Sequence, residues 1–166
     1  KIEAQNRGFA VSREYRQDDC GVLKPGEECP AIDRAKVGDI VEVKVTLVVP
    51  HYSHYVIVED PFPAGMEGVD TSLKTTSQAV EGPDMQKQGV EGSDYYGWWW
   101  MPTHVELRDE RAVMFETELE PGTYEFTYQA RASLPGTFLT LPPTAYQMYF
   151  PEVWGRGAGG VFEVSE

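Results

Sequence analysis

The sequence has few basic residues and no long apolar run. Lysine and arginine together number 14, against 27 aspartate and glutamate residues, so the formal net charge is -13. Binding to nucleic-acid phosphates needs a basic patch, so this balance argues against a nucleic-acid partner. No stretch reaches the roughly 18 apolar residues of a membrane-spanning helix, and no membrane insertion is expected. The chain begins at Lys1 without a methionine or signal peptide, as expected for a fragment or a processed product.

The sequence also lacks the common catalytic and metal-binding motifs. It contains no G-x-S-x-G, no H-E-x-x-H and no glycine-rich phosphate loop. His51 and His54 are spaced i, i+3, which is unusual for a metal pair on a strand or a helix. Glu59 and Asp60 are adjacent in a predicted strand and would point to opposite faces, so they make no acid/base pair. Asp60 precedes Pro61, and we interpret it as a turn residue. No enzymatic activity, metal or cofactor is expected.

Only two cysteines are present, and both lie in the segment CGVLKPGEEC, as Cys20 and Cys29. Two cysteines without a nearby histidine do not complete a four-ligand zinc site. A local disulfide between them is the favoured interpretation, with two free thiols in an exposed insertion as the alternative. A disulfide is typical of an extracytoplasmic protein.

Alternating apolar and polar residues predict several β-strands. In DIVEVKVTLVV (39–49) every second residue from Val41 to Val49 is aliphatic, and Pro50 follows. Gly122–Ala132 alternates in the same way, with aromatic residues at 124, 126 and 128. Period-2 patterns rich in β-branched and aromatic residues indicate half-buried strands.

Further short strands are expected around 9–15, 55–58, 137–141 and 160–164. A hairpin is also predicted, with strands at 104–108 and 112–117 joined by a tight turn at Asp109 and Glu110. A short helix is possible at 71–79 or 143–148. Seven or eight strands separated by glycine and proline turns predict an all-β fold: an antiparallel β-sandwich of the fibronectin type III or macroglobulin kind, as a single domain over 1–166.

Two regions interrupt this pattern. The first is a cysteine-containing insertion near 18–36, and the second is a long polar loop near 80–97 that leads into Trp98, Trp99 and Trp100. Such a dense run of rings either packs against the long loop or forms an interaction surface.

Three ordered segments resemble those of the C-terminal macroglobulin domain of bacterial alpha-2-macroglobulins. The first is VEDPFPAGME (58–67). The second is ELRDER (106–111), followed by PGTY (121–124) and YQARA (128–132). The third is PGTF (135–138), leading to Pro142, Pro143 and MYFPEVWGR (148–156). The resemblance covers about residues 7 to 156.

This resemblance implies a non-catalytic domain of an extracytoplasmic, broad-spectrum protease trap. In such proteins a thioester on another domain captures the protease, and the present chain has no cysteine–glutamine context for a thioester of its own. The implied partners are the thioester domain and other macroglobulin domains of the parent chain, with target proteases bound by the full-length trap.

The positions that match the family's thioester-covering loop are Met148 and Tyr149. A thioether and a phenol form a large apolar plug that would exclude water. The alternative is that both side chains pack in this domain's own core. An independent alternative for the whole chain is a cell-surface adhesion or carbohydrate-binding sandwich, in which the three tryptophans would stack on sugars.

Overall fold

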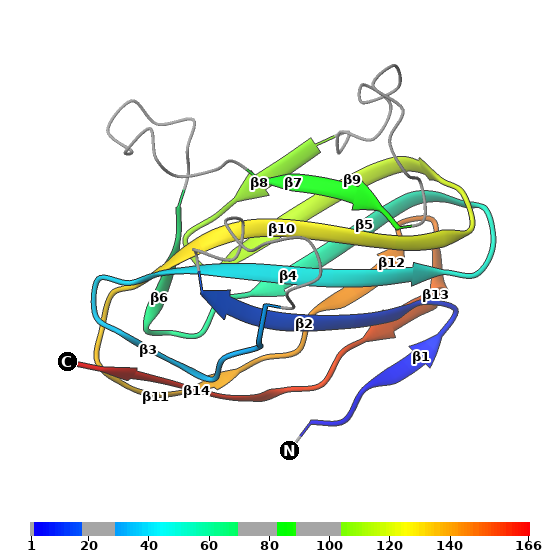
Figure 1. Ribbon diagram of the computed structural model, residues 1–166. Coiled ribbons are helices and arrows are strands. Elements are labelled where there is room, and N and C mark those ends of the chain that lie inside the picture. Colours follow the sequence, from blue (N-terminus) through cyan, green and yellow to red (C-terminus); the bar gives the residue numbers. More distant parts are fainter. Residues whose placement is uncertain (1, 18–28, 70–82, 89–103) are drawn as a thin grey trace.

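The computed structural model describes residues 2–17, 29–69, 83–88 and 104–166, and every regular element in them is a strand (Figure 1). The strands are β1 (Gln5–Arg7), β2 (Ala10–Gln17), β3 (Arg34–Lys36), β4 (Ile40–Val49), β5 (Ser53–Pro61), β6 (Met66–Gly68), β7 (Asp84–Lys87), β8 (His104–Leu107), β9 (Arg111–Leu119), β10 (Gly122–Ala132), β11 (Gly136–Thr140), β12 (Thr144–Gln147), β13 (Phe150–Arg156) and β14 (Gly160–Ser165).

Two antiparallel sheets form the sandwich. One has the order β1-β13-β12-β5-β9-β8, and the other has the order β2-β4-β10-β6, with β7 also paired to β10. A small third sheet, β11-β14-β3, lies near the C-terminus and includes one parallel pair, β3 with β14. The expected all-β sandwich is therefore confirmed, and its described part contains more strands than predicted because several have only three or four residues.

The core is formed by the alternating residues of the long strands. On β4 the side chains of Val41, Val43, Val45, Leu47 and Val49 are all buried, as their spacing predicts. On β10 the buried set is Tyr124, Phe126, Tyr128, Ala130 and Ala132. The facing sheet contributes buried side chains from β5, β9 and β12, so the apolar faces of the two sheets meet between them.

A buried polar cluster connects the two sheets. Arg13 on β2 forms an ion pair with Asp60 on β5, and it also donates to the carbonyl oxygen of Pro61 at 3.1 Å. The hydroxyl of Tyr128 donates to the second carboxylate oxygen of Asp60 at 2.8 Å. Burial raises the pKa of Asp60, and the guanidinium of Arg13 opposes this rise. Burial, followed by the field of Asp60, raises the pKa of Tyr128, so its phenol remains a donor.

This cluster corrects the interpretation of Asp60 as a turn residue. Asp60 is a strand residue of β5 with 1% of its surface exposed, and it is satisfied by partners from β2 and β10. The Asp-Pro pair suggested a turn. Arg13, 47 residues earlier in the chain, instead stabilises the buried carboxylate of Asp60 in an extended strand.

Three other expected irregular or helical segments are strands. Residues 143–148 contain β12 rather than a short helix, because Thr144–Gln147 is hydrogen-bonded between β5 and β13. β7 lies inside the stretch expected to be a long loop and pairs with β10, with Met85 buried. β3 lies at the end of the expected insertion and pairs with β14. The possible helix at 71–79 lies outside the described residues.

Candidate functional site

The expected interaction loop is a tight hairpin turn at the end of β12 and β13. Gln147 pairs with Phe150, so Met148 and Tyr149 are the two residues of the turn. Met148 is 44% exposed, Tyr149 65% and Phe150 56%. Exposure of the first two side chains agrees with the sequence-based expectation, and neither packs in the core of this chain.

The position of Pro151 follows from the irregular pairing after the turn. On β12 the pairing advances by one residue from Tyr146 to Gln147, while on β13 it jumps from Trp154 to Phe150. Pro151 lies in this irregular stretch, where no ladder N–H is needed from it. The proline therefore lies within β13, and residues 144–156 form a hairpin with a two-residue turn.

Aromatic side chains from neighbouring strands surround the turn. The ring of Tyr149 makes an edge-to-face contact with Tyr55 of β5, with centroids 5.1 Å apart and an interplanar angle of 89°. Tyr55 in turn lies over Phe115 of β9 at 6.4 Å. The amide of Met148 donates to the carbonyl oxygen of Tyr55 at 2.9 Å. The turn thus presents a thioether and a phenol, and the rings of Tyr55 and Phe115 pack beneath them. The turn contains no pair of a nucleophile and a general base.

Sequence reasoning did not identify Tyr55 or Phe115 as part of this site. Both are ordinary strand residues in sequence, and no motif distinguishes them. They join the site only because β12 pairs with β5, and β5 with β9.

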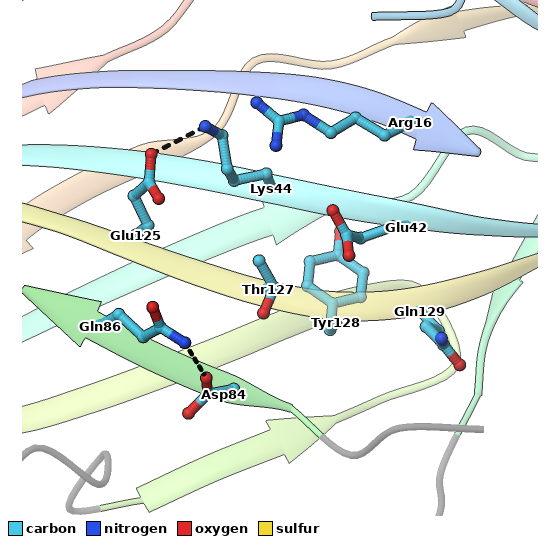
Figure 2. A pocket seen from close by; sticks show the side chains of 9 residues that line it. All are labelled: Arg16, Glu42, Lys44, Asp84, Gln86, Glu125, Thr127, Tyr128 and Gln129. Carbon is cyan, nitrogen blue, oxygen red and sulfur yellow. Dashed lines mark hydrogen bonds and ion pairs between the residues drawn. The ribbon is translucent and has the colours of Figure 1, made fainter. Parts of the chain in front are cut away.

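A polar groove of about 200 Å³ crosses β2, β4, β10 and β7 (Figure 2). Its basic side chains are paired with acids: the amine of Lys44 lies 2.7 Å from a carboxylate oxygen of Glu125, and Arg16 donates to Glu14 at 2.8 Å. The neutral amide of Gln86 donates to Asp84 at 2.8 Å. In the described part of the chain, no group of three or more histidine, cysteine or acidic side chains could hold a metal ion. Because acidic and basic side chains alternate along its lining, the groove has no uniform charge that would favour an anion or a cation.

An apolar groove lies at the third sheet. Ile2, Leu139, Leu141 and Val161 line it, and between 41% and 75% of each of these side chains is exposed. Contiguous exposed apolar residues mark surfaces that contact another protein or domain. This surface is separate in sequence from the Met148–Tyr149 turn.

The remaining predicted residues lie outside the described part of the chain. Cys20 lies outside it and Cys29 within it, so their pairing stays a prediction. Trp98, Trp99 and Trp100 also lie outside the described residues. Within the described residues, no helix has the length and apolar character needed to cross a membrane.

The two facing sheets form a macroglobulin-like β-sandwich. The chain belongs to the family described as the bacterial alpha-2-macroglobulin MG10 domain, whose model matches residues 8–152. This assignment agrees with the resemblance carried by the three sequence segments.

Two similar proteins of known sequence are named as alpha-2-macroglobulins. An alpha-2-macroglobulin homolog of Nostoc sp. is 26% identical over 155 residues, which are 91% of this chain and 7% of that protein. The alpha-2-macroglobulin of Escherichia coli K12 is 28% identical over 139 residues, 82% of this chain and 8% of that protein. The chain thus spans less than a tenth of the length of these relatives.

Solved structures show the same fold. Escherichia coli alpha-2-macroglobulin activated by porcine elastase matches with a TM-score of 0.74 and 20% identity, covering 99% of this chain and 14% of that one. Salmonella alpha-2-macroglobulin reacted with methylamine matches with a TM-score of 0.70 and 23% identity, covering 99% and 10%. In these structures the matching fold is one part of a multi-domain chain.

Proposed function

We propose that this chain is the non-catalytic C-terminal macroglobulin domain of a bacterial alpha-2-macroglobulin-like, broad-spectrum protease inhibitor. In this proposal the domain packs against a thioester domain of the same parent chain and shields its thioester from water through Met148 and Tyr149. The observation that carries the proposal is the exposure of these two large side chains on a tight turn of a chain that belongs to the MG10 family.

The physical argument concerns water. A thioester is hydrolysed by water, so a resting trap has to keep it dry until a protease triggers it. Met148 supplies a flexible, polarisable thioether, and Tyr149 supplies a broad ring with one polar tip. Both are costly to leave in solvent and gain free energy when an apolar surface covers them. In a parent without a thioester, the same turn would lock the two domains together.

The proposal also assigns partners and a compartment. The other macroglobulin domains of the parent chain would contact this one, and the exposed apolar groove at the third sheet supports a second interdomain surface. Target proteases would be bound by the full-length trap. Because such traps meet foreign proteases outside the cytoplasm, the proposed location is extracytoplasmic.

The decisive experiment uses the full-length parent protein with Met148→Ala and Tyr149→Ala combined. We expect the thioester to react with methylamine about tenfold faster, because loss of roughly 1.4 kcal/mol of interdomain contact shifts an opening equilibrium tenfold. The released thiol is followed by absorbance. Val48→Ala is the matched control: it also removes an exposed apolar side chain, from the outer face of β4, which belongs to neither proposed interdomain surface, and should leave the reaction rate unchanged.

Two outcomes would contradict the proposal. One is an unchanged methylamine rate in the double variant of a thioester-containing parent. The other is a large loss of stability of the 166-residue chain carrying both substitutions, which would show that the side chains belong to its core. The chain alone should neither cleave peptides nor inhibit proteases, so stoichiometric inhibition of an elastase by this chain would also overturn the division of labour.

A further inference from the structure

Tyr55 has an unusual backbone conformation within β5. Its φ is +52°, and among the residues that the structure describes it is the one non-glycine residue with positive φ. The left-handed region is unfavourable for a bulky side chain, because Cβ crowds the following carbonyl oxygen. Such a conformation persists only where surrounding contacts hold it, and it often occurs at functional positions.

The conformation changes which residues of β5 face outward. Ser53 and Val56 are both buried, at 3% and 0% exposure, although they are three residues apart. Strict alternation would place them on opposite faces. The change of phase occurs at His54 and Tyr55, which are consecutive and both exposed. Tyr55 itself alternates with the buried Val56, so its ring lies on the outer surface beside the hairpin turn, and the change of phase turns Ser53 inward and His54 outward.

Two separate contacts connect Tyr55 to the turn. Its carbonyl oxygen accepts the amide hydrogen of Met148, with nitrogen and oxygen 2.9 Å apart. This bond continues the β5–β12 ladder by one residue beyond the pair of Val56 and Gln147. The Tyr55 ring makes an edge-to-face contact with the Tyr149 ring, with centroids 5.1 Å apart. It also stacks on the Phe115 ring, with centroids 6.4 Å apart and an interplanar angle of 26°.

We propose that Tyr55 is a positioning residue that holds Met148 and Tyr149 in their outward orientation. Its left-handed backbone directs the carbonyl group toward Met148, and its ring, supported by Phe115, fixes the Tyr149 ring. An exposed two-residue turn with large side chains would otherwise sample several rotamers. Ordering the side chains before the domains meet lowers the entropy that is lost on contact.

The structural part of this proposal concerns the chain alone, and its functional consequence rests on the proposed shielding role. Three substitutions separate the two contacts. Tyr55→Phe keeps the ring and changes the backbone preference little. Tyr55→Gly accepts positive φ but removes the ring. Tyr55→Val removes the ring and, being β-branched, strongly disfavours positive φ.

Two readouts on the 166-residue chain report the contacts independently. Hydrogen exchange of the Met148 amide reports the backbone bond, and the NMR shifts of the Tyr149 ring protons report the ring contact. With Tyr55→Phe, the Met148 exchange rate and the Tyr149 ring shifts should stay as in the unsubstituted 166-residue chain. With Tyr55→Gly the Tyr149 shifts should move toward those of a free tyrosine while Met148 stays protected. With Tyr55→Val both should change, and Met148 should exchange about tenfold faster, as expected when one local hydrogen bond is lost.

Tyr52→Val is the matched control, because Tyr52 is also an exposed aromatic residue of this surface but its ring lies against His54. It should alter neither readout. Equal effects of the glycine and valine variants on Met148 exchange would contradict the backbone part of the proposal. Unchanged Tyr149 shifts in both would contradict the ring part.

In the full-length parent, Tyr55→Val should accelerate the methylamine reaction severalfold and Tyr55→Phe should restore the parental rate. If the Met148 and Tyr149 double variant leaves that rate unchanged, the shielding function fails, and the exchange and NMR readouts still decide the positioning role. If the double variant reacts faster but Tyr55→Val does not, the shielding function stands and positioning by Tyr55 is wrong.

Discussion

Arg13 and Asp60 join the two sheets of the sandwich through one buried ion pair. Arg13 lies on β2 and Asp60 on β5, and their side chains are 4% and 1% exposed. The pair is completed by Tyr128, which donates to the same carboxylate. β5 also pairs with β12, the strand that leads into the Met148–Tyr149 turn, so the ion pair anchors the strand next to that hairpin to the facing sheet.

Removal of one partner of this pair should strongly destabilise the chain. We expect Arg13→Met to lower the free energy of unfolding by about 3–5 kcal/mol at pH 7, because it leaves a buried carboxylate without its cation. Urea denaturation followed by circular dichroism measures the change. The control is Asp33→Asn, which removes the exposed Asp33–Arg34 pair and should cost less than about 1 kcal/mol. A loss of similar size in both variants would contradict the structural role of the buried pair.

The same variant should have a distinctive pH dependence. Burial already raises the pKa of Asp60, and removing Arg13 removes the main influence that lowers it. A carboxyl group with a raised folded-state pKa stabilises the fold most below its unfolded pKa, and this contribution is lost as pH rises through the folded pKa. The loss of unfolding free energy in Arg13→Met, relative to the unsubstituted 166-residue chain, should therefore shrink as the pH falls from 7 toward 4. A deficit that is constant or grows on acidification would contradict this assignment.

Gly155 should be intolerant of a side chain. It lies on β13 between Asn6 of β1 and Ala145 of β12, and an added Cβ would collide with the carbonyl oxygen of Phe9. Because the obstructing atom is backbone, relief requires a shift of the main chain. We expect Gly155→Ala to cost about 1–3 kcal/mol in unfolding free energy.

The matched control for this substitution is Gly160→Ala on β14. That position is exposed, and the nearest atom to an added Cβ is the Thr140 hydroxyl oxygen at 3.3 Å. Its loss of stability in thermal unfolding should be below about 1 kcal/mol. Equal melting temperatures for the two variants would show that β13 can move away from Phe9.

The predicted disulfide between Cys20 and Cys29 is tested by thiol titration. In protein produced in an oxidising compartment and denatured without reductant, we expect no reactive thiol, and two after reduction. Reduction should also lower the melting temperature, because a closed loop of this length contributes about 2–3 kcal/mol in the chain-entropy model. Two reactive thiols before reduction would refute the prediction.

Several parts of this protein were determined by the local sequence. The alternation in β4 and β10 predicted both strands and their buried faces, because period-2 patterning is a direct consequence of strand geometry. The polar Asp109 and Glu110 between two strand segments predicted the β8–β9 hairpin, because a short polar link between two strands favours a tight turn. The resemblance to bacterial alpha-2-macroglobulins singled out Met148 and Tyr149 as surface residues, whereas the local sequence left open whether they pack in the core.

Other features were decided by the tertiary structure. Strands of three or four residues, such as β3 and β7, are too short to show a period, and only pairing with β14 and β10 makes them strands. Residues 144–147 are extended because β5 and β13 flank them. Asp60 is buried in a strand because Arg13 neutralises it across the sandwich. Tyr55 adopts its left-handed conformation because its neighbours in space, and not those in sequence, offset the local steric cost.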